Sequence, residues 1–177
     1  MDPQLIVNGI ALGSIIALGA VGLTLTCGIL RLSNFAHGDL MTLGAFVAWM
    51  VNRSPIPVLN NIWVSMLVGI VATVGVALLT EAILWKRMRR VRATSTTLVI
   101  ISIGLALFLR NGILLIWGSD AKRFNLPIAS AIDVFGIKIK FYNLVVLGLA
   151  LVAIAALHFL LQNTKIGKAM RAVADDI

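Results

Sequence analysis

Five long apolar segments, separated by short polar stretches, dominate the hydrophobic pattern of this chain. They cover residues 5–30, 35–51, 62–85, 98–117 and 143–161. A helix needs about 20 residues, within a range of roughly 17–25, to cross the hydrocarbon core of a bilayer. All five segments reach this length, the second only just. The pattern therefore predicts an all-α polytopic membrane protein, with about five transmembrane helices in one bundle over residues 1–161.

The composition supports lipid as the solvent of this fold. Of the 177 residues, 60% are hydrophobic and 12% are charged, whereas a soluble domain has about 25% charged residues. The mean hydropathy is +1.02. A net charge of +8 would suit nucleic acid, but in a membrane protein it is typical of cytoplasmic loops rich in Lys and Arg. We expect membrane lipid as a partner and no nucleic acid.

The basic residues predict the orientation. Residues 86–96 hold five Lys and Arg side chains and no acid, which places this loop in the cytoplasm. Alternation of the spans then puts the N-terminus outside and residues 162–177 inside. In this arrangement nine basic residues lie inside and five lie outside, so the bias agrees with the rule.

A polar stretch opens the second apolar segment. Asn34, His37 and Asp39 stand at the mouth of a span, where polar groups are costly and are usually kept for a purpose. Gly38 and Gly44 would let another backbone or a solute approach closely. His37 and Asp39 are two residues apart and point to different sides of an ideal helix, unless the helix is kinked at Gly38. Two interpretations stay open: a helix cap at the membrane surface, or a gate in a translocation path.

Three ionisable residues lie within later spans, and one of them, His158, is one turn from Leu161 and is expected at the interface. Glu81 is one turn from the predicted inner end of its helix, near Lys86 and Arg87, which favours pairing at the surface. Arg110 lies about 10 Å beneath the predicted outer end. It is long enough to reach the surface, or it shares a polar cavity with Asn111.

Residues 162–177 predict an amphipathic cytoplasmic helix. Its apolar positions recur at i, i+3, i+4 and i+7, the spacing of one helix face: Ile166, Ala169, Met170 and Val173. Thr164 is the expected N-cap. Periodicity alone fits a helix lying on anionic lipid or one docked in a groove of a partner.

The long polar segment between the fourth and fifth spans contains one regular pattern. Residues 132–139 alternate between apolar and polar side chains well enough to predict a short external β-hairpin.

Two motifs resemble a known family. Gly22-Leu23-Thr24-Leu25, followed by Asn34-Phe35-Ala36-His37-Gly38-Asp39-Leu40-Met41, is similar to the permease subunits of ABC importers for branched-chain amino acids. Relatives in that family carry other neutral amino acids, amides or urea. The stretch Thr164-Lys165-Ile166-Gly167-Lys168-Ala169-Met170-Arg171-Ala172-Val173-Ala174-Asp175-Asp176 resembles the cytoplasmic coupling segment of the family. The resemblance covers the whole chain as the N-terminal part of a family subunit.

The resemblance implies a transport subunit of the bacterial inner membrane. Its partners would be a homologous second permease, two ABC ATPase subunits and an extracytoplasmic substrate-binding protein. Gly167-Lys168 lacks the upstream glycine of a phosphate-binding loop, so ATP hydrolysis is expected in a partner chain and no cofactor in this one.

The residues expected to carry these roles form two groups. The candidates for the translocation path or gate are Asn34, His37, Gly38, Asp39, Gly44 and Arg110. The candidates for ATPase coupling are Thr164, Ile166, Gly167, Met170, Arg171 and Ala172.

Three other functions compete with this one. A passive channel for a small neutral solute would also use small-residue packing, but it has no need of a coupling segment. A membrane-embedded enzyme using His37, Asp39 and His158 is not supported, because no HExxH or GxSxG pattern occurs and two histidines with one cysteine make a poor metal set. Because relatives continue beyond the coupling segment through further helices, a truncated, split or non-transporting form is the third alternative.

Overall fold

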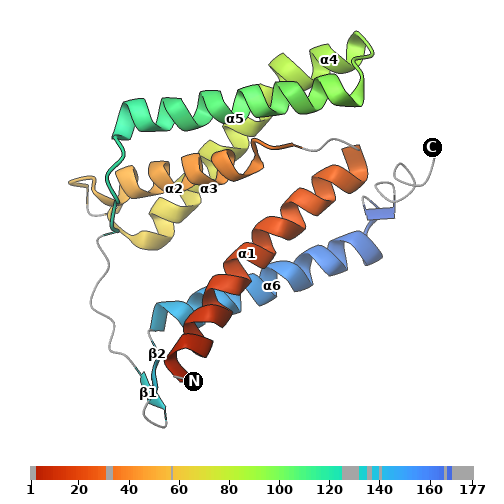
Figure 1. The fold of residues 1–177 in the computed structure, drawn as a ribbon. Helices are drawn as coiled ribbons and strands as arrows, with labels where there is room; N and C mark the ends of the chain where they lie inside the picture. The colour runs from red at the N-terminus through yellow and green to blue at the C-terminus, as the bar shows by residue number, and fades with distance from the viewer. Residues whose placement is uncertain are drawn as a thin grey trace. The chain divides into compact units, whose positions relative to one another are not determined.

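The computed structural model describes residues 3–30, 34–56, 58–124, 132–134, 137–139, 141–165 and 167–168. The chain forms two compact units. The first contains Met1–Arg31 and Pro127–Ile177, and the second contains Leu32–Leu126. Figure 1 labels the α-helices and β-strands of both units.

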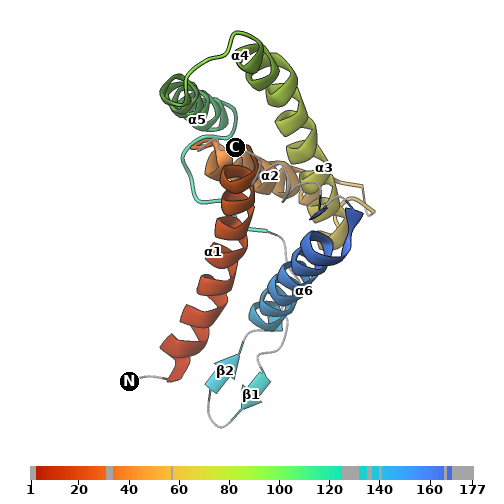
Figure 2. The same cartoon turned by 90° about the vertical axis from the view of Figure 1, so that its right-hand side faces the viewer.

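The first unit pairs the first and last helices. α1 (Pro3–Leu30) packs on α6 (Phe141–Asn163), and Figures 1 and 2 show the two side by side. Near their N-terminal ends, the amide Nδ2 of Asn143 donates to Oδ1 of Asn8 at 3.4 Å. α1 is continuous through Gly22 and Gly28, so its 28 residues extend about 42 Å. Because this exceeds a hydrocarbon core of about 30 Å, α1 is tilted or extends beyond the lipid.

The predicted hairpin is confirmed. β1 (Ile132–Val134) and β2 (Ile137–Ile139) pair antiparallel, with Ile132 opposite Ile139 and Val134 opposite Ile137. β2 also contacts α1. The polar segment before α6 therefore contains regular structure that belongs to the first unit.

The second unit is built on close packing between α2 (His37–Asn52) and α3 (Ile62–Thr80). A Cβ atom built on Gly69 would lie 2.7 Å from the carbonyl oxygen of Gly44 and 2.9 Å from Cβ of Ala48. A Cβ on Gly44 would overlap the hydroxyl of Thr73. Small residues at four-residue spacing on both helices thus let the backbones touch, as in many membrane helix pairs.

The buried core of this unit joins α2 to α5 (Ser95–Trp117). Ala36 and Leu40, at the start of α2, pack with Trp85 and with Leu105 and Leu109 of α5. α5 begins at a capped end, since the hydroxyl of Thr94 accepts a hydrogen bond from the Thr97 N–H.

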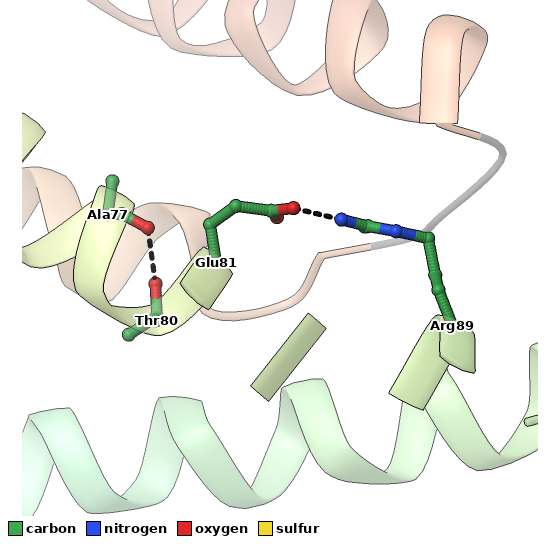
Figure 3. A network of polar contacts seen from close by, with 4 residues as sticks. All are labelled: Ala77, Thr80, Glu81 and Arg89. Carbon is green, nitrogen blue, oxygen red and sulfur yellow. Dashed lines mark hydrogen bonds and ion pairs between the residues drawn. The ribbon is translucent and has the colours of Figure 1, made fainter. Parts of the chain in front are cut away.

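α3 continues through a π-helical turn, η1 (Glu81–Trp85), into α4 (Lys86–Arg90). Figure 3 shows the carboxylate of Glu81 paired with the guanidinium of Arg89. Eight residues of α-helix would leave these side chains about 80° apart, whereas the extra residue of a π turn gives them the alignment of a seven-residue spacing. The predicted pairing of Glu81 at the surface therefore holds, but its partner is Arg89 instead of Lys86 or Arg87.

The basic segment 86–96 is not wholly a loop. It is helical to Arg90, and the chain then turns through Arg92, whose φ of 52° lies in the left-handed region. The Ala93 N–H donates to the Met88 carbonyl at 3.1 Å and the Arg92 N–H to the Arg89 carbonyl at 3.2 Å. These two bonds form a Schellman motif, with arginine at the position that glycine usually occupies.

Four helices among the described residues are long and apolar enough to cross a membrane: Leu5–Gly28, Ile62–Arg90, Ser95–Trp117 and Tyr142–Asn163. α2 has 16 residues, about 24 Å, and is shorter than the hydrocarbon core. Large apolar side chains stand exposed along these helices, as Leu115 does with 88% of its surface accessible. The predicted class, an all-α polytopic membrane protein, is confirmed, with four to five spans.

Candidate functional site

The start of α2 is held by Asn34 and Ser102. The side-chain oxygen of Asn34 accepts the Ala36 N–H at 3.1 Å, and its carbonyl accepts the His37 N–H at 3.2 Å. The Phe35 N–H donates to the hydroxyl of Ser102, a buried residue of α5, at 3.3 Å. Asn34 therefore shapes the turn that precedes α2, whereas the N-cap position itself is Ala36, which has no side-chain cap bond.

His37, Gly38 and Asp39 form the first turn of an unbroken helix. His37 and Asp39 are half-buried and Gly38 is exposed. Since two residues of α-helix turn by about 200°, the imidazole and the carboxylate point to different sides. Asp39 stands where the helix dipole favours a negative charge. The structure therefore shows no kink that would bring these two side chains onto one solute.

Gly44 and Arg110 lie apart from this turn. Gly44 is buried against α3, where it serves packing between backbones. The buried face of α5 contains Ser102, Leu105, Leu109 and Ile113. Arg110 is exposed and lies off that face, about 12 Å along α5 from Ser102. Asn111 is exposed too, and its amide donates to the Leu107 carbonyl at 2.7 Å.

The six path candidates are thus not gathered in one place. Asn34, His37, Gly38 and Asp39 share one end of α2, whereas Gly44 is part of a helix interface and Arg110 stands on the exposed side of α5.

The predicted coupling segment starts in a sharp turn after α6. Thr164 is a bend, and residues 165, 167 and 168 are helical. The hydroxyl of Thr164 accepts the Gly167 N–H at 3.0 Å and donates to the Leu160 carbonyl at 2.5 Å. The Lys168 N–H donates to the Thr164 carbonyl at 3.1 Å. The expected N-cap is confirmed, and its hydroxyl also binds the end of α6.

Gly167 lies directly against the end of α6. A Cβ atom there would lie 2.5 Å from Cα of Leu161 and would also overlap the carbonyl oxygens of Leu160 and Leu161. These are backbone atoms, which cannot move aside as a flexible side chain can. The close approach at Gly167 is therefore to α6 of its own chain. Ile166, Met170, Arg171 and Ala172 lie outside the described residues.

A polar cavity of about 740 Å³ lies at the C-terminal end of α2. Its walls come from the end of α2, from Asn60 and from the segment that follows α5: Trp49, Asn52, Arg53, Asn60, Asp120, Ala121, Lys122, Arg123 and Phe124. The sequence offered one signal, because Trp49, Asn52 and Arg53 share a helix face. The sequence predicts the charged residues of this set in two separate outer loops. It predicts no cavity, because only the fold brings residues 120–124 next to α2.

Comparisons with known proteins agree on one family. A family model described as "Branched-chain amino acid transport system / permease component" matches residues 5–177. The high-affinity branched-chain amino acid transport system permease protein LivH is 29% identical over 187 residues in both Salmonella typhimurium and Escherichia coli K12. Protein BraD of Pseudomonas aeruginosa, with the same description, is 26% identical over 187 residues.

Each match covers 98% of this chain and 59% of the relative, so the chain spans less than two thirds of the length of these relatives. No solved structure gives a significant match. The family model covers nearly the whole chain, and the spans have the length and hydropathy of a multi-pass membrane protein. The chain belongs to the family of permease components of branched-chain amino acid transport systems.

Proposed function

We propose that this chain is part of the transmembrane permease subunit of an ATP-driven importer for branched-chain or other neutral amino acids. The family match over residues 5–177 and the transport named for its relatives support this proposal. The turn at Thr164 and Gly167 is the observation that supports coupling to an ATPase in this proposal. It attaches the start of the amphipathic segment firmly to α6.

In this proposal the coupling segment acts as a lever. Its apolar face, Ile166, Ala169, Met170 and Val173, docks in a groove of a cytoplasmic ATPase. Because the Thr164 hydroxyl bonds to both α6 and the new helix, a push on the segment moves α6 instead of bending the turn. Because α6 packs on α1, a displacement of α6 is passed on to α1, the other helix of the first unit.

The same proposal gives the polar start of α2 the role of a gate. In the predicted orientation this turn faces the inner side, together with residues 162–177. Asn34 and Ser102 fix its position, and His37 and Asp39 supply the polar groups. In the complete importer we place a homologous second permease, two ATPase subunits and an extracytoplasmic binding protein in a bacterial inner membrane.

A retention experiment in detergent tests the coupling role. The tagged chain is incubated with its candidate ATPase, and the wild type is compared with Ile166→Asp/Met170→Asp. We expect the wild type to retain the ATPase and the double variant to lose at least nine tenths of it, because two charges enter the apolar face. Lys168→Asp is the matched control, since it changes the net charge by the same amount on the opposite face.

Gly167→Ala provides a second readout, with Gly148→Ala on the exposed side of α6 as its control. Nothing lies within 4 Å of a Cβ built on Gly148. We expect Gly167→Ala to reduce ATPase retention several-fold and Gly148→Ala to leave it unchanged. If the ATPase binds neither the wild type nor any variant while circular dichroism shows folded helix, the coupling role is wrong and the passive-channel function gains support.

A further inference from the structure

The cavity at the end of α2 is organised around Trp49. Its indole Nε1–H donates to the carbonyl oxygen of Arg123 at 3.0 Å, which ties α2 to the segment after α5. The guanidinium of Arg53 and the ammonium of Lys122 each lie 5.4 Å from the centre of the Trp49 ring. The ring therefore holds two cations at the rim of one cavity.

Asn52, one turn further along the same face of α2, fixes another part of the lining. This residue is buried, and its Nδ2 donates to the Asn60 carbonyl at 2.8 Å, which closes the chain between α2 and α3. The hydrogen bonds of Trp49 to Arg123 and of Asn52 to Asn60 therefore tie this end of α2 to both neighbouring segments of the lining. A cavity of about 740 Å³ lies in the size range of small-molecule sites, roughly 300–1,000 Å³.

The charges of the cavity are unbalanced. Its described lining includes three basic side chains, Arg53, Lys122 and Arg123, and one acid, Asp120. Asp120 is 3.9 Å from Lys122 and 91% exposed, so it screens that ammonium weakly. Arg53 and Lys122 can be no more than about 11 Å apart, close to one Debye length at 0.1 M salt. An anionic group between them would relieve their mutual repulsion.

We propose that this cavity, the Trp49 pocket, binds a free α-amino acid through its carboxylate. Arg53 and Lys122 would bind the carboxylate with charge-assisted hydrogen bonds. Asp120 offers an acceptor for the ammonium group, and the indole offers an apolar surface for the side chain. The choice of an amino acid as the ligand rests on the proposed function, and the predicted orientation puts the pocket at the outer end of the second unit.

Titration calorimetry tests this site on the full chain in nanodiscs of zwitterionic lipid. The probes are leucine and leucinamide, which lacks the carboxylate. We expect leucine to bind the wild type and leucinamide to bind at least tenfold more weakly. Arg53→Gln/Lys122→Gln should lower the affinity for leucine at least tenfold. Arg87→Gln/Arg90→Gln removes the same charge at the opposite end of the second unit and should leave that affinity unchanged.

Several results would overturn the proposal: no leucine binding, equal binding of leucine and leucinamide, or equal losses in the two double variants. Binding of acetyl-hexaglutamate amide without leucine would assign the pocket to acidic side chains of a partner protein. Binding of inorganic phosphate without leucine would assign it to a phosphate group instead of a carboxylate. ATPase retention by Arg53→Gln/Lys122→Gln separates the outcomes, because a chain that keeps the ATPase without binding leucine leaves the permease function standing.

Discussion

At the scale of single residues, glycine marks the positions where two backbones touch. Gly44 and Gly69 bring α2 and α3 together, and Gly167 brings the coupling segment onto the end of α6. At Gly38, Gly75 and Gly148, an added Cβ atom would have nothing within 4 Å. Glycine costs a helix about 0.5–1 kcal/mol relative to alanine, so at the first three positions close packing offsets this cost.

The contrast between Gly69 and Gly75 gives a direct prediction within one helix. Gly69→Ala should destabilise the protein by about 1–3 kcal/mol, because the new methyl group meets the Gly44 carbonyl oxygen at 2.7 Å. Gly75→Ala should leave stability unchanged or raise it by up to about 1 kcal/mol. The measurement is the free energy of unfolding, obtained from an SDS titration that is monitored by circular dichroism. Equal effects of the two substitutions would show that α2 and α3 do not pack through Gly69.

At the scale of elements, the π turn of the third span sets the alignment of its two ends. Before the π turn, α3 places Gly69 against α2. At the end of the turn, Trp85 packs in the core with Leu105 and Leu109. A straight α-helix with the same number of residues would rotate one contact by about 100° relative to the other. The π turn absorbs one residue and lets both contacts form.

This role predicts that a deletion inside the turn is tolerated. Removing exposed Ala82 should convert the π turn to an α turn and keep Gly69 and Trp85 in place, with a stability loss within about 1 kcal/mol. Removing Ala72, in the regular part of α3, should rotate Thr73 away from Gly44 and Ala77 away from the core by about 100°, and should cost about 3 kcal/mol or more. The same SDS titration measures both variants. A larger loss from the Ala82 deletion than from the Ala72 deletion would contradict this account of the turn.

At the scale of the whole molecule, basic residues gather in two sets. The predicted orientation places these sets at opposite faces of the membrane. The larger set, in residues 86–92, extends the third span as helix before the chain turns. The smaller set, Arg53, Lys122 and Arg123, runs against the positive-inside bias. The fold collects these three around Trp49. In the predicted orientation, a binding role for that cavity would explain cations on the less favoured side.

Cysteine labelling in intact cells checks the orientation. In a Cys27→Ser background, Ser119→Cys should react with a membrane-impermeant maleimide added from outside. Arg90→Cys and Lys168→Cys should react only after permeabilisation, because the loop after α4 and the coupling segment are expected in the cytoplasm. The background variant without cysteine is the control. The opposite labelling pattern would reverse the orientation and place the Trp49 pocket inside.

The sequence determined much of the secondary structure. Apolar length gave the spans because the hydrocarbon core has a fixed thickness, alternation gave the hairpin, and Thr164 gave the N-cap. These features depend on neighbours within a few residues. The end of the third span was misjudged because the polarity of residues 86–90 indicated a loop, whereas the helix continues there and Glu81 pairs with Arg89.

Only the tertiary structure decided which residues share a site. The sequence leaves Gly44 open to contact with another backbone or with a solute, and in the structure it packs on α3, while Arg110 stands apart from the turn at His37. The Trp49 pocket is lined by residues 49, 52, 53 and 60 together with residues 120–124. No local sequence pattern predicts that two segments so far apart in the chain line one pocket. The physical reason is that spans are selected by transfer into lipid, which each segment undergoes by itself. Sites arise from packing between segments, which depends on small residues and single hydrogen bonds far apart in the chain.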